Sequence, residues 1–209
     1  MSHNLPDCQV AGENEFLPNR REEIIRAAAI LFRRQGFDAT SMQDIAAAVG
    51  MLKGSLYYHF ASKEELLNEV VNRGVDRLLA GAEPIFASPD LGPREKLRQL
   101  IRNHLLHLAQ NNDSLVIASY VADKLEKEHR KAYVAKRDRY EGFLRQVVVE
   151  GIAAGEFPPV DVKLTVWAIL GMCNWSIQWY RPDGPYSAEY IADYMSHLIC
   201  DLMLAKPKG

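Results

Sequence analysis

Residues 53 to 63 bring lysine, hydroxyl and imidazole side chains together within a few helical turns. Lysine can donate to guanine, serine and tyrosine hydroxyls can reach bases or phosphates, and a tyrosine ring can press on a thymine methyl group. The side chains expected to face outward for this chemistry are Lys53, Ser55, Tyr57, Tyr58 and His59. Ordinary packing of a short helix is the alternative for the aromatic residues, and a solvated charge is the alternative for Lys53.

Two short helices are expected to hold this segment. The inward positions are Met42, Ile45, Ala46, Val49, Leu56 and Phe60. The small Ala46 suits the point where the two helices touch, and Gly50 permits the tight turn between them. Thr40 or Ser41 caps the first of these helices. Gln43 or Asp44, three residues further on, completes a capping box.

The charge distribution favours the same region. Residues 19 to 63 contain seven basic and four acidic residues, whereas the remainder contains 18 basic and 23 acidic residues. Arg20 and Lys63 stand at expected helix starts, which attract anions, so both would contact phosphates; a solvated charge is the alternative for Arg20. A DNA-packing protein without a sensor would be basic throughout, and the acidic remainder argues against that class.

The segment from Thr40 to Leu67 resembles the DNA-binding head of the TetR family of repressors. The matching runs are Thr40-Ser41-Met42-Gln43-Asp44-Ile45-Ala46, Val49-Gly50, Lys53-Gly54-Ser55-Leu56-Tyr57-Tyr58-His59-Phe60 and Lys63-Glu64-Glu65-Leu66-Leu67. The resemblance implies an all-α homodimer that has two domains and leaves DNA when a ligand binds the second domain. It also implies DNA contacts from Thr40, Ser41, Gln43 and Gly54. Many members carry Ser or Thr where Leu52 stands, so the usual cap of the third helix is absent here.

Helical spacing of apolar residues over almost the whole chain predicts an all-α fold. Three short helices end near Gly36, Gly50 and residue 58, and six longer ones follow. Their expected ranges are 62–83, 94–110, 114–127, 129–154, 162–180 and 188–205. Residues 1–18 lack periodicity and are expected to form a disordered tail. The predicted DNA-binding domain spans residues 19–65, and the ligand-binding and dimerisation domain spans residues 66–209.

The two last helices are expected to form a dimer interface. The helix over 162–180 is apolar on almost every side, so it must be buried on every side, with one face on its own subunit and another on a second subunit. The helix over 188–205 carries an apolar stripe, and the two helices can pair with their symmetry mates as a four-helix bundle. A twofold dimer then predicts a palindromic operator with half-sites about one helical turn apart.

Polar residues on otherwise apolar helix faces indicate a pocket for a small molecule. These residues are His104, Tyr120, Tyr140, Asn174 and Gln178. Each has a plainer interpretation, because a buried histidine or tyrosine is commonly a satisfied core residue, and Asn174 can bridge a dimer. Together they predict a mainly apolar cavity with a few polar anchors.

The segment from Trp175 to Pro185 resembles one found in family members that control lipid, sterol or aromatic-acid breakdown and respond to acyl-CoA thioesters. The resemblance implies that the acyl part lies among Trp167, Met172, Trp175 and Trp179. It also implies that Lys124, Arg137 or Arg181 meets the CoA phosphates. A free hydrophobic compound is the alternative effector, and a plain type I or II turn is the alternative for residues 181–185.

Other classes of protein have less support. No Ser-His-Asp arrangement or glycine-rich phosphate loop can be placed, so an enzyme is not expected. His104 and His107 could ligate a metal, but no third ligand can be named, and no cofactor is expected. Cys8, Cys173 and Cys200 suit neither a disulfide framework nor a zinc site, which favours the reducing cytosol. The most apolar run, Leu164–Tyr180, is too short and too polar to span a membrane.

Overall fold

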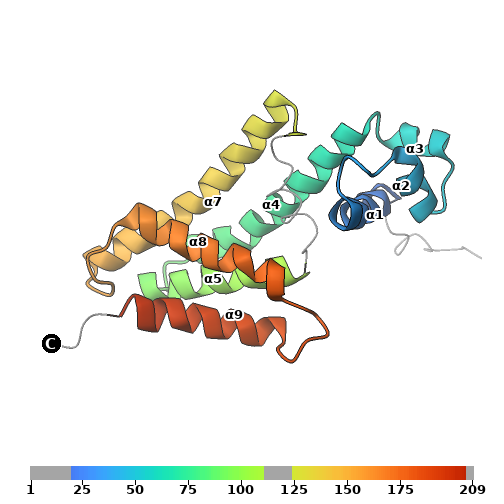
Figure 1. Cartoon of the computed structure of the whole chain (residues 1–209). Helices are drawn as coiled ribbons and strands as arrows, with labels where there is room; N and C mark the ends of the chain where they lie inside the picture. The colour runs from blue at the N-terminus through green and yellow to red at the C-terminus, as the bar shows by residue number, and fades with distance from the viewer. Residues whose placement is uncertain (1–19, 111–123, 206–209) are drawn as a thin grey trace, which may run out of the picture.

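The computed structural model describes residues 20–110 and 124–205, and every regular element in these ranges is helical. The all-α prediction is therefore confirmed. The elements are α1 (Arg20–Gln35), α2 (Met42–Ala48), α3 (Lys53–His59), α4 (Lys63–Ala87), α5 (Pro93–Gln110), α7 (Lys127–Ala153), α8 (Val162–Trp179), α9 (Ala188–His197) and the π-helical η2 (Leu198–Met203). We call residues 20–62 the head and the helices from α5 onward the body; α4 runs from one to the other (Figure 1).

Most helix boundaries agree with the prediction, and two differ. Helix α4 does not stop before Pro84 but continues to Ala87. Proline removes only the hydrogen bond to the Ala80 carbonyl, and its fixed φ suits a helix, so a single final turn can follow it. The expected helix over 114–127 falls mostly outside the described residues, and α7 begins at Lys127, two residues earlier than expected.

A small apolar core closes the head. Its fully buried side chains include Ile24, Ala28, Ile45, Ala46, Leu56 and Phe60. Gly50, with a φ of 63°, makes the turn between α2 and α3, a conformation that glycine adopts without steric cost. The inward residues of α2 and α3 are thus the expected ones, and the opposite side of α3 faces away from the core.

Ion pairs fasten α1 to the first half of α4. The Glu22 carboxylate pairs with the guanidinium groups of Arg73 and Arg77. Arg21 lies 3.4 Å from the Glu69 carboxylate and also donates to the His59 carbonyl at 2.7 Å. Because α1 also packs on α2, the whole head is joined to the start of α4.

Helix α5 lies at the centre of the body and contacts α4, α7, α8 and α9. Its buried residues include Leu97, Leu100, Ile101 and Leu105. Two ion pairs hold α9 and η2 against it, between Arg102 and Asp193 at 2.6 Å and between Arg98 and Asp201 at 2.8 Å. Among the described helices, none combines the length and apolarity needed to cross a bilayer.

Candidate functional site

The outer side of α3 presents the predicted polar side chains to solvent. Tyr58 is 90% exposed and Tyr57 is 45% exposed, while Leu56, on the side of α3 that faces the head core, is fully buried. The Lys53 ammonium lies 6.0 Å from the centre of the Tyr57 ring. Ser55 and Gly54 are exposed, and His59 is half-buried with its ring edge against Tyr58. Ordinary packing therefore does not account for Tyr57 and Tyr58.

An open hollow borders this side of α3. It lies between the start of α2, the residues Lys53 and Tyr57 of α3, and the start of α4. At the start of α2, the Ser41 hydroxyl accepts from the Asp44 amide at 3.2 Å and the Asp44 carboxylate accepts from the Ser41 amide at 2.8 Å. The capping box therefore uses Ser41 and Asp44, and hydrogen bonds from the Ser41 hydroxyl and then the Ser41 amide to the Asp44 carboxylate lower its pKa. Gln43 remains exposed.

Two predicted DNA contacts have their polar atoms engaged within the head. The Thr40 side chain is 1% exposed and its hydroxyl donates to the Gly36 carbonyl at 2.7 Å, so a contact from this side chain was a wrong expectation. The Lys63 ammonium donates to the Phe37 and Thr40 carbonyls, each at 2.8 Å, and lies over the Phe37 ring. In this structure Lys63 therefore stabilises the turn before α2.

Arg20 and Leu52 occupy the edges of the same surface. Arg20 donates to the Val49 carbonyl at 2.7 Å and stays exposed, so it links α1 to the end of α2. Leu52 is the N-cap residue of α3, and no side-chain hydrogen bond caps this helix. The missing cap that the sequence indicates is confirmed.

The body brings His104, Tyr140 and Asn174 together. His104 Nδ1 lies 3.1 Å from the Tyr140 hydroxyl, and Nε2 lies 2.9 Å from Asn174 Oδ1. The Asn174 oxygen accepts from Nε2–H, and the Tyr140 hydroxyl has two acceptors in reach, His104 Nδ1 and the Leu100 carbonyl at 3.4 Å. Burial lowers the pKa of His104 to about 4 and raises the pKa of Tyr140. Both ring nitrogens have protein partners, which agrees with the satisfied-core interpretation.

The three tryptophans of α8 do not enclose a cavity within one protomer. Trp175 is 66% exposed, and Trp167 and Trp179 are also exposed, while Met172 is half-buried. The prediction of an acyl site among them is therefore wrong for a single protomer. Within one protomer α8 is buried on one face, through Val166, Ile169, Cys173 and Ser176, which is the face expected to pack on its own subunit. The reason is that α5 and α7 cover only one side of it.

A surface groove lies between α7 and α8. The residues that line it include two predicted ones, Arg137 and Trp167, and two that the prediction missed, Arg145 and Lys163. Trp167 Nε1 donates to Glu141 at 3.1 Å, and the Lys163 ammonium lies 4.7 Å from the Trp167 ring centre. The spacing of Lys163 and Trp167, one helical turn apart, was the signal in the sequence. We call these residues the α7–α8 groove.

The other predicted phosphate contacts lie elsewhere. Lys124 pairs with Asp38 of the head. Arg181 donates to the Tyr180 carbonyl at 3.0 Å, and the Gly184 amide donates to the Arg181 carbonyl, so the turn interpretation fits this segment. Tyr120 lies outside the described residues. Across residues 20–110 and 124–205, no three His, Cys, Asp or Glu side chains are placed to hold a metal ion, and His104 and His107 stand without a third ligand there.

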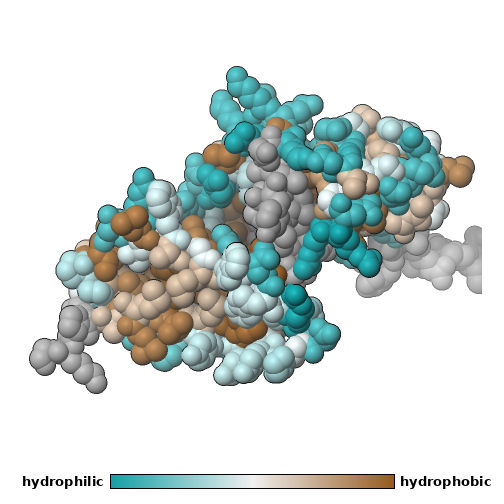
Figure 2. Space-filling model, in the orientation of Figure 1, coloured by the Kyte–Doolittle hydropathy of each residue, from teal (hydrophilic) through white to brown (hydrophobic). Residues whose placement is uncertain are grey.

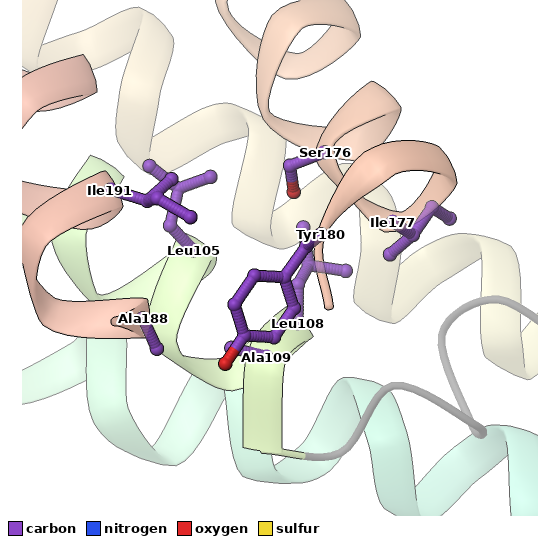
Figure 3. Close-up of a pocket in the computed structure, with 8 residues that line it drawn as sticks. All are labelled: Leu105, Leu108, Ala109, Ser176, Ile177, Tyr180, Ala188 and Ile191. Carbon is purple, nitrogen blue, oxygen red and sulfur yellow. The ribbon is translucent and has the colours of Figure 1, made fainter. Parts of the chain in front are cut away.

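A second, apolar pocket lies where α5, α8 and α9 meet (Figure 3). Its lining residues are Leu105, Leu108, Ala109, Ser176, Ile177, Tyr180, Ala188 and Ile191. The Tyr180 ring lies across the space between α5 and α9 (Figure 3). The free volume is about 10 Å³, room for a single water molecule, so this pocket is closed in the present conformation.

Comparison with known families decides what kind of protein carries these features. Residues 24–70 match the family model described as bacterial regulatory proteins, tetR family, and residues 90–203 match the tetracyclin repressor-like C-terminal domain. The chain belongs to the TetR family. The predicted resemblance is thereby confirmed, and it extends from the head to the body.

Individual TetR-family proteins match along most of the chain. The transcriptional repressor KstR2 of Mycobacterium tuberculosis is 34% identical over 186 residues, 88% of this chain and 90% of KstR2. The structure of that ketosteroid regulator superposes with a TM-score of 0.83, at 30% identity over 88% of this chain and 95% of that one. PfmR of Thermus thermophilus has a TM-score of 0.78, at 40% identity over 85% of this chain and 96% of that one.

A third TetR-family structure contains both a ligand and DNA. AibR, in complex with isovaleryl coenzyme A and operator DNA, has a TM-score of 0.76 and 31% identity, covering 87% of this chain and 98% of that one. The family and these relatives are regulators of transcription.

The buried His104 predicts a pH-dependent stability of this TetR-family chain. At pH values between the unfolded-state pKa of 6.5 and the folded-state pKa of about 4, the unfolded state binds a proton on His104 that the folded state excludes. Stability is therefore full above pH 6.5 and falls as the pH drops toward 4. When the pH is lowered from 7.5 to 5.0, protonation of His104 in the unfolded state should reduce the free energy of unfolding by about 2 kcal/mol. Urea unfolding of the wild type and His104→Gln, at one protein concentration, measures this difference; equal pH dependence in both would contradict it.

Proposed function

We propose that this TetR-family chain is a homodimeric repressor that binds a palindromic operator through α3 and is released by an acyl-CoA thioester. The observation that carries the DNA-binding part is the exposed row of Lys53, Ser55, Tyr57 and Tyr58 on a helix whose other side closes the head core. In helix-turn-helix proteins, side chains on the recognition helix reach base edges in the major groove.

The surroundings of α3 support the same role. The hollow beside Lys53 and Tyr57 is bordered by the starts of α2 and α4, where backbone amides favour phosphate. Ser41, Gln43 and Arg20 stand exposed around α3 and are proposed to position the head on the duplex. The operator complex of AibR shows that a relative of this architecture binds DNA.

The proposed dimer rests on a large apolar surface that α8 and α9 leave uncovered. In Figure 2 this apolar surface gathers at the lower left, over α8 and α9. Its exposed side chains include Leu164, Trp175, Trp179, Tyr190, Tyr194 and Leu202. Monomeric proteins rarely expose contiguous apolar patches of this kind. A twofold partner would cover the surface and bury α8 on the side that one protomer leaves open.

The α7–α8 groove is the proposed site of the nucleotide part of the effector. Lys163 supplies a cation for phosphates, Arg137 and Arg145 can do so in exchange for their pairs with Asp138 and Glu141 of the same groove, and the Trp167 ring supplies a face on which a base can stack. AibR, a relative of the same fold, binds isovaleryl coenzyme A. The groove thus offers the two chemical features that distinguish a CoA thioester from its free acid.

A free hydrophobic effector is the second candidate. The observation that favours it is the apolar lining of the pocket among α5, α8 and α9 (Figure 3). That pocket would have to open, because its present volume holds only one water. Release of the operator by free acids but not by their CoA thioesters would favour this candidate.

Operator binding is expected to depend on α3. Lys53→Ala and Tyr57→Ala should each weaken binding to the chain's own upstream DNA by roughly 10-fold or more, because a good base contact is worth about 1–3 kcal/mol. Gel-shift titration at fixed salt measures the effect. Lys96→Ala, at the far end of the body near Phe86, removes the same charge and should bind normally. Loss of helix content or of dimer mass in the α3 variants would mean that these residues belong to the core.

Dimer formation is expected to fail when charge is placed on the uncovered surface. Trp175→Glu should shift the mass in solution toward that of a monomer, since burying an unpaired carboxylate is strongly unfavourable. Light scattering after size exclusion measures the mass. Ile30→Glu places the same charge at an exposed apolar site of the head and should leave the dimer intact. A dimeric Trp175→Glu protein would contradict the proposed interface.

Release by CoA thioesters is expected to require the α7–α8 groove. Lys163→Ala and Trp167→Ala should raise the thioester concentration needed for half-release by about 10-fold, corresponding to ~1.4 kcal/mol. Arg181→Ala removes a positive charge outside the groove and should respond like the wild type. The measurement is operator release by a series of CoA thioesters and by coenzyme A alone. An unchanged response in the groove variants, with a weakened response in Arg181→Ala, would place the site in the α8–α9 turn instead.

A further inference from the structure

Leu52 exposes more of its surface than any other large aliphatic side chain in the described ranges. It is 79% exposed, compared with 62% for Leu202 and 61% for Leu164 on the proposed dimer surface. Pairing of α8 and α9 accounts for those two, but not for a residue in the head. A partner that covered this leucine would remove its apolar surface from water, which lowers the free energy.

The position of Leu52 adds a second cost. The starts of α2, α4, α8 and α9 are each capped by a serine or aspartate side chain that accepts a backbone amide hydrogen bond. Leu52 holds the same position at the start of α3 and has no such hydrogen bond. The start of α3 therefore lacks the stabilisation that a side-chain cap supplies and also leaves an apolar side chain in water.

The proposed function places a specific partner beside this side chain. The N-terminal residues of a recognition helix contact base edges in the major groove. Leu52 directly precedes Lys53 and lies about one turn before Leu56 and Tyr57, so it belongs to that end of α3. The apolar group that the major groove presents is the C5-methyl of thymine.

We propose that Leu52 contacts a thymine methyl group in each half-site and so helps to determine which operator is bound. This inference rests on the proposed binding of DNA through α3. A serine or threonine at this position would cap the helix and reach a phosphate, which carries no base identity. Leucine at this position lacks the phosphate contact and instead contacts the methyl group that distinguishes thymine from cytosine.

The test replaces single thymines by deoxyuridine, which lacks only the methyl group. The probe is the upstream fragment of the chain's own gene, or the best site selected from random duplexes, with symmetric replacement in both half-sites. At one thymine position the wild type should lose affinity about fourfold per half-site, or roughly 16-fold in total, the effect of one buried carbon group each. For Leu52→Ala the same replacement should change affinity less than twofold.

Tyr57→Ala is the matched control, because the Tyr57 ring could press on the same methyl. It should weaken binding but keep the penalty for deoxyuridine. If Tyr57→Ala abolishes the penalty and Leu52→Ala keeps it, or if no thymine position shows a penalty in the wild type, the Leu52 inference is overturned while DNA binding stands. If the wild type selects no duplex at all, the proposed function itself fails.

Leu52→Ser keeps the test independent of folding. Because serine restores the cap of α3, this variant should be at least as stable as the wild type in thermal unfolding. It should nevertheless lose the deoxyuridine penalty. A Leu52→Ser protein that retains the full penalty would show that the leucine side chain does not make the contact.

Discussion

Helix α4 is shared between the head and the body, and the position of the head depends on this helix. Its first half, which packs on α1, buries Leu66, Leu67 and Val70, while Val75, Leu78 and Ala82 are buried further along, toward the body. Glu22, with Arg73 and Arg77, adds charged contacts between α1 and α4. A head fastened in this way moves with α4 as one unit. Packing that shifts α4 in the body must therefore move the recognition helix.

The dependence of the head on α4 has a consequence for a dimer of this chain. If α8 and α9 form the proposed twofold interface, the distance between the two α3 helices follows from the direction of each α4. A small rotation of α4 then changes the spacing of the recognition helices by much more than the movement at the ligand. To overcome specific operator binding, an effector must favour the released arrangement by about 3 kcal/mol or more.

Local sequence signals predicted the helices. The features that the prediction missed depend on contacts between residues that are far apart in the sequence. Gly36 and Gly50 end or join helices with positive φ, as their positions indicated. In contrast, Lys63 bonds to carbonyls 23 and 26 residues away. No local pattern shows that its ammonium is used inside the head. The exposure of Trp167, Trp175 and Trp179 was missed for the same reason, because apolar composition does not tell which faces one protomer covers.

The α7–α8 groove could likewise be predicted only in part. Arg145 of α7 and Lys163 of α8 line one groove only because these two helices pack together. In the proposed function, the same packing connects an effector on the surface of α7 to α4. Lys136 and Arg139, neighbours of Arg137, pair with Asp76 and Glu83 of α4 at 2.7 and 3.0 Å. Such partly exposed pairs contribute only about 0–1 kcal/mol each, less than release requires.

The larger share must therefore come from apolar packing between the same helices. Phe86 of α4 stacks on Phe143 of α7 with ring centres 4.4 Å apart, and Leu144 is fully buried beside them in the core. Close-packed side chains cannot deform by small amounts without loss of contact. If the proposed effector displaces α7 through Arg137, α4 therefore has to follow, and with it the head.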